Sequence, residues 1–234
     1  MIIASPWSGD SLNYARMAWV LEYSARRHNP GADVRIPNID QRSTTRSPAF
    51  LAKSRSWVEI VHSVPIGSEL VLLDTDTLVL GPLGGAFDRE GWDIAVTTRG
   101  CTSTLNSGVL FVRVSQRARD WIAPWAELTE PWCARNEPGR VRFGDQDALK
   151  DMVRGRPGAA LRALPCKIWN AEQHCWPPVD GCKIVHVKSD ARRLLFGGTC
   201  HGNPGADVVA EMWRAEERAA SPGIYGLPAA LERV

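Results

Sequence analysis

Residues 69–80 have the sequence ELVLLDTDTLVL, and this stretch decides the fold class. The apolar run that precedes Asp74 has the length of a strand and is typical of a central strand covered on both faces. Asp74 and Asp76 follow the run directly. Because residues i and i+2 of an extended chain project to the same side, we expect both carboxylates to converge at the carboxyl end of this strand.

Apolar periodicity and turn residues predict that strands and helices alternate around this stretch. The expected strands lie at residues 1–6, 32–37, 69–73, 93–97, 109–114, 161–164 and 183–187. A turn at residues 8–11 is expected to begin a helix that ends near residue 28, and the other expected helices lie at residues 48–62, 117–128, 145–153 and 208–219. Residues 131–144 and 197–205 are expected to form irregular loops. The alternation indicates an α/β protein.

The bulk composition is that of one ordinary globular domain. The chain has 234 residues, of which 44% are hydrophobic and 23% charged. Its 28 basic and 26 acidic residues are interspersed, which disfavours an electrostatically driven nucleic-acid binder. No apolar run approaches the roughly 20 residues that cross a bilayer, and the MIIASP start lacks a basic leader and a cleavage site. We therefore expect a cytoplasmic protein.

The six cysteines contain no CxxC pair, so the zinc-ribbon and thioredoxin interpretations have no support. Reduced, partly buried thiols are the expected state. Cys and His are nevertheless dense in one part of the chain, and a structural zinc site there stays open as an alternative. The residues concerned are Cys166, His174, Cys175, Cys182, His186, Cys200 and His201.

Two like charges at the end of a core strand are unfavourable unless a cation or a cationic ligand compensates them. In open α/β sheets, ligands bind at this end of the strands. Carboxylate oxygens favour Mg²⁺ or Mn²⁺, with phosphate oxygens completing the coordination shell. The alternative is that the acidic pair merely ends the strand, with Asp74 capping a turn and Asp76 solvated.

Residues 70–83, LVLLDTDTLVLGPL, resemble the strand, DxD motif and following loop of GT-A glycosyltransferases, especially the retaining glycosyltransferase family 8 group. Further segments are similar to that group in order and approximate spacing. They are LNSGVLF at 105–111, FGDQDAL at 143–149, KIVHVK at 183–188 and, more faintly, LPCKIWNA at 164–171. The resemblance covers residues 1–193. It implies a GT-A, Rossmann-like three-layer α/β/α sandwich with a mostly parallel central sheet.

The resemblance also implies one domain over residues 1–234 with two functional halves. Residues 1–104 or so would bind the nucleotide and the metal, and residues 105–234 would hold the acceptor and catalytic groups. The implied metal ligands are Asp74, Asp76 and His186, around Mn²⁺ or Mg²⁺. The implied catalytic groups are Asn106, which faces the donor sugar or acceptor, together with Asp145, Gln146 and Asp147 beside the reacting sugar.

The remaining donor contacts are carried over from the same resemblance. The nucleotide base is expected near Ser5, Pro6 and Trp7, with Asn13 or Tyr14 assisting, and Thr75 lies within the DxD motif. The family's basic residue on the helix before that motif corresponds to Lys53 or Arg55. Its diphosphate lysine sits in a K-P-W run that this chain lacks, which leaves Lys188, Arg192 and Arg193 as candidates.

Each segment also has a purely structural interpretation. Asn106 can belong to a turn before a strand, Asp145 can cap a helix N-terminus, and His186 can be a satisfied core histidine. Ten tryptophans are many for this length, and indole rings stack on sugars as well as filling cores. We expect most of them in the core, with Trp121, Trp125, Trp132 and Trp176 as candidates for an acceptor groove.

The expected activity is metal-dependent transfer of a hexose from a nucleotide-diphosphate sugar, with UDP-glucose or UDP-galactose as the default, to an acceptor hydroxyl with retention. An inverting enzyme would instead need a carboxylate base such as Asp147 or Glu172. The alternatives are a sugar-nucleotide nucleotidyltransferase, although MIIASPWSGD lacks its Gly-rich basic signature, and a non-catalytic binding module. A glycan, a small molecule, a lipid-linked saccharide, a protein or a modified nucleic-acid base all stay open as acceptors, and the sequence does not indicate an oligomeric state.

Overall fold

The computed structural model describes residues 1–7, 12–39, 46–99, 105–135, 144–199, 202–203 and 205–221. Its main element is a six-stranded sheet in which five strands run in one direction and β6 runs in the other. The strand order is β2 (Asp33–Arg35), β1 (Ile2–Ala4), β3 (Glu69–Leu73), β6 (Leu105–Arg113), β5 (Ile94–Thr98) and β7 (Leu161–Pro165). The expected α/β class and mostly parallel sheet are confirmed.

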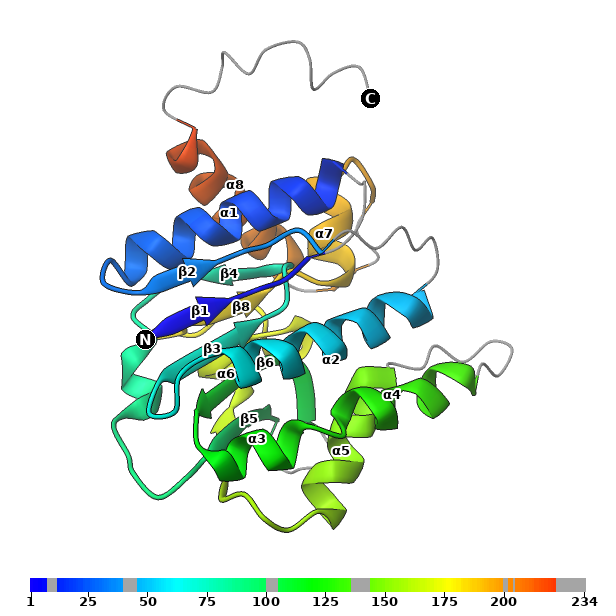
Figure 1. Cartoon of the computed structure of the whole chain (residues 1–234). Helices are drawn as coiled ribbons and strands as arrows, with labels where there is room; N and C mark the ends of the chain where they lie inside the picture. The colour runs from blue at the N-terminus through cyan, green and yellow to red at the C-terminus, as the bar shows by residue number, and fades with distance from the viewer. Residues whose placement is uncertain are drawn as a thin grey trace.

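Helices cover both faces of this sheet, which gives three layers (Figure 1). One face carries α2 (Arg46–Ser63), α3 (Gln116–Ile122), α4 (Trp125–Ala134) and α5 (Gly144–Gly155). The other face carries α1 (Leu12–His28) and the short helices η1 (Gly84–Phe87) and α6 (Cys166–Trp169). Beyond α1 lie α7 (Ser189–Leu195) and α8 (Ala206–Ala220), and η3 (Gln173–Cys175) precedes β8.

The unbroken apolar sequence of β3 follows from this layering. Leu70 and Leu72 pack toward α2, whereas Val71 and Leu73 pack toward α1, and all four side chains are fully buried. Both faces of the strand therefore contribute to the core, as a central strand requires. Full burial of each such side chain stabilises the fold by about 1.5–3 kcal/mol. The acidic pair is thus attached to one of the most firmly packed strands.

A second, two-stranded sheet joins β4 (Thr77–Val79) to β8 (Ile184–His186) in antiparallel register. The expectation that a loop follows Asp76 is wrong here, because Leu78 and Val79 are fully buried and pair with β8. The expected strand at residues 183–187 is present, in this small sheet. The pairing sets Thr77 opposite His186, so His186 lies beside the acidic pair.

The expected helix at residues 117–128 is two helices, α3 and α4, and this prediction was wrong. Pro124 has no backbone N–H to continue the first helix, and it occupies the N-cap position of the second. The loop expected at residues 131–144 does not begin at residue 131, since α4 continues to Ala134 with Pro131 inside it, and residues 136–143 lie outside the described residues. The turn expected at residues 8–11 lies outside the described residues. Among the helices of the described ranges, none combines the length and the apolar character that a membrane crossing requires.

Candidate metal centre

The reversed direction of β6 brings its first residues to the edge of the sheet where β3 and β5 end. The backbone N–H of Asp74 donates to the carbonyl of Gly108 at 2.8 Å, so the acidic pair and the Asn-Ser-Gly segment are direct neighbours. Opposite β5, the register jumps from a Val96–Leu110 pair to a Thr97–Asn106 pair. Such an irregularity re-aims side chains near sites, and here it places Asn106 and Ser107 in the buried rim of the edge.

Asp74, Asp76 and His186 form a compact cluster at this edge. Nε2 of His186 lies 2.8 Å from Oδ1 of Asp76 and 3.5 Å from Oδ2 of Asp74. All three ligand atoms lie within 4.8 Å of one another, and among the described residues this is the one group of three or more His, Cys, Asp and Glu side chains with that property. Carboxylate oxygen and imidazole nitrogen together suit a divalent cation such as Mn²⁺. The residues therefore fit the metal that the sequence predicts.

The position of His186 depends on β8 and on Gly108. The pairing of β8 with β4 is extended by a hydrogen bond from the N–H of Val187 to the carbonyl of Asp76 at 2.7 Å. A Cβ atom at position 108 would lie only 2.2 Å from Cε1 and 2.6 Å from Nδ1 of the imidazole. Only glycine lets β6 pass this ring, which is fully buried. This close approach explains why a glycine stands in the Asn-Ser-Gly segment.

Two cations compensate the carboxylates of the cluster. Nζ of Lys53 lies 2.7 Å from Oδ1 of Asp74 and 2.8 Å from Oδ2 of Asp145. Burial lowers the pKa of Lys53, but these two carboxylates outweigh it and raise the pKa above its ordinary value. Nη1 of Arg192 lies 3.2 Å from Oδ2 of Asp76. Arg55, the other candidate on α2, is exposed.

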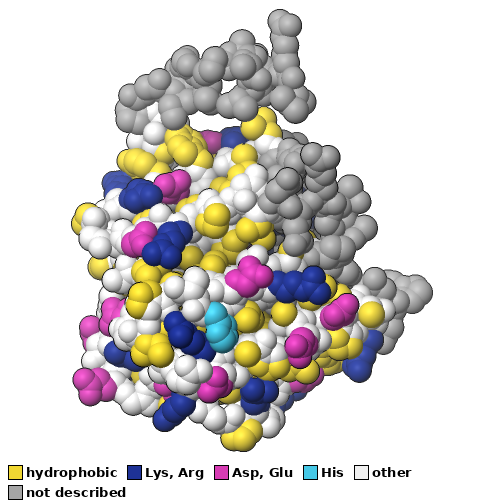
Figure 2. Space-filling view, viewed as in Figure 1, with side chains coloured by type: hydrophobic (Ala, Val, Ile, Leu, Met, Phe, Trp, Pro, Cys, Tyr) yellow, Lys and Arg dark blue, Asp and Glu magenta, His cyan; other side chains and the backbone are white. Residues whose placement is uncertain are grey.

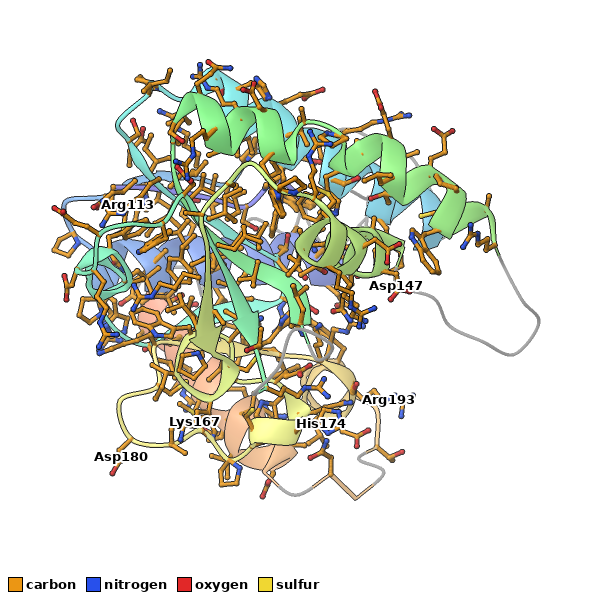
Figure 3. The ribbon with its side chains drawn as sticks, turned by 90° about the horizontal axis from the view of Figure 1, so that it is seen from below. Arg113, Asp147, Lys167, His174, Asp180 and Arg193 are labelled. Carbon is orange, nitrogen blue, oxygen red and sulfur yellow. The ribbon has the colours of Figure 1, made fainter. Side chains whose placement is uncertain are left out.

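The carboxylate of Asp76 is held in its ionised form. Burial raises its pKa, but the neighbouring His186, Arg192 and Lys188 reverse that effect and leave the pKa well below the ordinary value. Lys188 itself is half-buried and occupies the N-cap position of α7. Arg193, labelled in Figure 3, is exposed and pairs with Asp190 instead. Of the three basic candidates for the diphosphate, Arg192 and Lys188 therefore act on the cluster.

The first turn of α5 places its three polar residues in different surroundings. Asp145 is buried and accepts a hydrogen bond from Oγ of Ser107 at 2.8 Å as well as the contact from Lys53. Gln146 is half-buried, with its Oε1 3.4 Å from the N–H of Ser107. Asp147 pairs with Lys150 at 3.1 Å and projects at the edge of α5, apart from the strands (Figure 3). Of these three residues, Asp145 and Gln146 contact Ser107, which borders the cluster of Asp74, Asp76 and His186.

The residues expected around the nucleotide base follow β1 at the same edge. The hydroxyls of Ser5 and Thr75 are buried and lie 3.4 Å apart, which joins the end of β1 to the DxD segment. Pro6 is buried, and Trp7 is half-buried and forms a bridge to Asn38. Asn13 is exposed at the start of α1. The structure thus brings Ser5 and Thr75 together, and the roles of the others stay predictions.

The cysteines and tryptophans are mostly packing residues. Burial raises the pKa of the Cys166 thiol to about 12 and that of Cys182 to about 11, and it also raises the pKa of Cys175. Cys200 and His201 lie outside the described residues. Trp121 and Trp125 are buried between the helices, so their assignment to an acceptor groove was wrong.

Sequence reasoning overlooked several polar residues around Asn106. Arg99 and Ser107 were not singled out, Asn170 was noticed only within a faint motif, and Glu172 only as an alternative base. Asn170 and Glu172 are buried and contact the Asn106 amide at 3.0 Å each. The available signal was the polar Asn-Ala-Glu run directly after the apolar Ile168 and Trp169, since buried polar side chains need partners.

No family model matches the sequence, and no curated protein matches it. Solved structures do. A glycosyltransferase involved in the glycosylation of the major capsid of PBCV-1 superposes with a TM-score of 0.63 at 14% identity, over 92% of this chain and 98% of that chain. The galactosyltransferase LgtC, in complex with donor and acceptor sugar analogs, gives a TM-score of 0.59 at 15% identity, over 94% and 100%.

The glycosyltransferase GlyE of Streptococcus pneumoniae TIGR4 is also similar, with a TM-score of 0.61 at 17% identity. The match covers 93% of this chain but only 62% of GlyE. At such identities the likeness concerns the fold. The expected GT-A fold is confirmed.

Proposed function

We propose that this chain is a metal-dependent glycosyltransferase that moves a hexose from a UDP-sugar to an acceptor hydroxyl with retention of configuration. The observation that carries the proposal is the convergence of Asp74, Asp76 and His186 at the sheet edge that also holds Asn106 and Gln146. The GT-A fold, shared with solved glycosyltransferases, supports the same activity. A hydroxyl of a glycan or a small molecule is the acceptor in this proposal.

The cluster would hold Mn²⁺ or Mg²⁺, and such a cation, when bound, neutralises charge on the leaving diphosphate. Arg192 and Lys188 bring two further positive charges close to Asp76 and would bind phosphate oxygens of the donor. The residues that follow β1, with Ser5 joined to Thr75, receive the nucleotide. Because these groups are fixed by strand ends, the donor is oriented before the reaction begins.

The sugar lies against the first turn of α5 in this proposal. Gln146 presents a half-buried carboxamide there, and it stabilises and orients the reacting sugar. Asp145 pairs with Lys53, and Lys53 also pairs with Asp74, so one cation links α2, α5 and the DxD segment. Asp145 is engaged by Lys53 and Ser107, which makes it a positioning group in this arrangement.

Retention is supported by the state of the two carboxylates that inversion would use as a base. Asp147 pairs with Lys150 at the edge of α5. For Glu172, burial raises the pKa, but the ion pair with Arg99 outweighs burial and leaves the pKa below its ordinary value. A carboxylate of lowered pKa is a weak proton acceptor at neutral pH. Glu172 therefore lacks the properties of a general base, and Asp147 is paired with Lys150 apart from the strands (Figure 3).

Calorimetric titration with UDP, GDP and dTDP, each with and without Mn²⁺, tests the proposal. We expect Mn²⁺-dependent binding of UDP, and we expect Asp76→Asn to weaken it by more than roughly 100-fold, since loss of an outer-shell partner alone costs 10–100-fold. Asp33→Asn is the matched control, because it removes an aspartate from an exposed pair with Arg35. Release of UDP from UDP-glucose or UDP-galactose then distinguishes an enzyme from a binding module.

Two results would contradict the proposal. Equal UDP affinity with and without Mn²⁺, or in wild type and Asp76→Asn, would remove the metal assignment. Metal-dependent UDP binding without any turnover of UDP-sugars would favour the non-catalytic module.

A further inference from the structure

We infer that Glu172, held by Arg99, is a positioning residue that fixes the tautomer of His186 through two intervening amides. The inference rests on the proposed function in one respect, namely that His186 is a cation ligand. The relay of hydrogen bonds runs from Glu172 through Asn106 and Asn170 to the imidazole, and its members are buried except for the Arg99 side chain.

The end of the relay nearest the metal cluster is Asn170. Its Nδ2 donates to Oγ1 of Thr97 at 2.9 Å and to Oδ1 of Asn106 at 3.0 Å. The Thr97 hydroxyl donates its own hydrogen to the carbonyl of Asn106, so it accepts from Asn170. Both amide hydrogens of Asn170 are thereby used, and its Oδ1 faces Nδ1 of His186 at 3.0 Å.

This arrangement decides which imidazole nitrogen carries the hydrogen. An amide oxygen only accepts, so Nδ1 of His186 must donate to Asn170. Nε2 is then the nitrogen that faces Asp74 and Asp76, and it would present its lone pair to a cation bound there. A metal-binding histidine is usually fixed in this way by a partner on its other ring nitrogen.

The middle of the relay is Asn106. Its Oδ1 accepts from the backbone N–H of Gly108 at 2.7 Å and from Asn170, which uses both lone pairs of the oxygen. Its Nδ2 donates to Oε2 of Glu172 at 3.0 Å. The amide is therefore held in one orientation by a backbone group on one side and by a carboxylate on the other.

Glu172 completes the relay because both of its oxygens accept. Oε1 receives the Nε–H of Arg99, and Oε2 receives the amide of Asn106. A glutamine at this position would have to turn its NH₂ group toward one of these two donors, and a donor would then face a donor. The carboxamide oxygen prefers the charged guanidinium, so the contact with Asn106 is the one that breaks. Loss of the charge at 172 therefore releases the relay at its far end.

Two measurements on Glu172→Gln test the inference. The first is Mn²⁺ affinity in the presence of UDP, followed by the electron paramagnetic resonance of free Mn²⁺, and we expect it to fall by about 10-fold, the lower end for an outer-shell partner. The second is the Nδ1–H signal of His186 in ¹⁵N-labelled, metal-free protein. We expect a slowly exchanging signal in wild type and its loss or rapid exchange in the variant.

Glu217→Gln is the matched control, because Glu217 is half-buried and, like Glu172, is paired with an arginine, here Arg16 in the contact of α1 with α8. It should lower stability without changing either readout. If Glu172→Gln fails to fold, Glu172→Asp keeps the charge, withdraws the carboxylate from Asn106 by one methylene and carries the same two readouts.

The outcomes separate this inference from the proposed function. An unchanged His186 Nδ1–H signal in Glu172→Gln overturns the relay, whatever the Mn²⁺ affinity. Absence of Mn²⁺ binding in the wild type overturns the metal assignment, and the Nδ1–H measurement still decides the relay. A lost signal together with weakened Mn²⁺ binding, neither seen in Glu217→Gln, supports both.

Discussion

Substitution of Gly108 by alanine tests the packing of β6 against the metal cluster. The added Cβ would lie 2.2 Å from Cε1 and 2.6 Å from Nδ1 of His186, and 2.9 Å from Oδ1 of Asn106. Cβ contacts of this length do not occur in folded proteins, so the ring or the strand must move. His186 is fully buried and is bonded on both sides, to Asn170 and to Asp76. Room for the methyl group is therefore lacking.

Overpacking of a buried site costs about 1–3 kcal/mol, and the clash with an immobile ring places Gly108→Ala near the upper end, at about 3 kcal/mol. For a chain of this length that corresponds to a melting temperature lowered by about 6–12 °C. Mn²⁺-dependent UDP binding should weaken as well, because the displaced ring belongs to His186, a proposed metal ligand. Thermal melting and calorimetry measure the two effects.

Gly84→Ala is the control, since a Cβ there meets no atom within 4 Å. The double-mutant cycle with His186→Ala sharpens the test, because removal of the ring opens the space that the methyl group needs. Gly108→Ala should therefore cost much less stability in the His186→Ala background than in wild type. Equal costs in the two backgrounds, or a Gly108→Ala protein as stable as Gly84→Ala, would refute the proposed contact.

Two further predictions concern buried charges. Lys53→Met leaves Asp74 and Asp145 without their shared cation, and we expect a loss of about 3 kcal/mol in urea denaturation, as for a broken buried ion pair; an unchanged midpoint would contradict it. The carboxylate of Asp93 accepts hydrogen bonds from the N–H of Ala160, the hydroxyl of Ser115 and the guanidinium of Arg117. Burial raises the pKa of Asp93, but these contacts outweigh burial and leave the pKa below its ordinary value of 3.8. A lowered folded pKa gives stability that is complete above 3.8 and is lost as the pH falls through the folded value. Asp93→Asn should thus cost about 2 kcal/mol at pH 7 and progressively less below pH 3.8, in melting curves at several pH values; a pH-independent difference would contradict it.

Much of the fold was predictable because its signals are local. The apolar run before Asp74 indicates a strand covered on both faces, and the structure buries both faces of β3. The break between α3 and α4 also had a local signal, Pro124, although the predicted helix ran through this residue.

The strand β4 was missed for a different reason. Three residues carry no periodicity, and Thr77–Val79 is a strand only because β8, more than a hundred residues later, pairs with it.

The site residues, like the fold, were predictable where a local sequence motif marks them and were missed where only distant contacts define them. Asp74, Asp76 and His186 were predicted as a group, and the structure brings them together. Lys53 was one of two candidates, and only its position relative to Asp145 separates it from Arg55. In the relay that contains Glu172, Asn106 and Glu172 are separated by 66 positions in the chain, and Asn170 and His186 by 16. The sequence around each of these residues does not indicate its partner. The direction of each hydrogen bond decides the tautomer of His186, and that direction follows from contacts in the folded structure rather than from the sequence.

The wide separation of Asp76 and His186, 110 positions along the chain, has a consequence for the order in which the molecule is made. A loop of that length costs about 4 kcal/mol to close, so the early part of the chain cannot hold the histidine in place by itself. The cluster forms only when β8 docks on β4, which requires that the chain has been made beyond residue 186. A bound cation would therefore stabilise chains in which β8 has docked, and it would not stabilise a nascent chain that lacks β8.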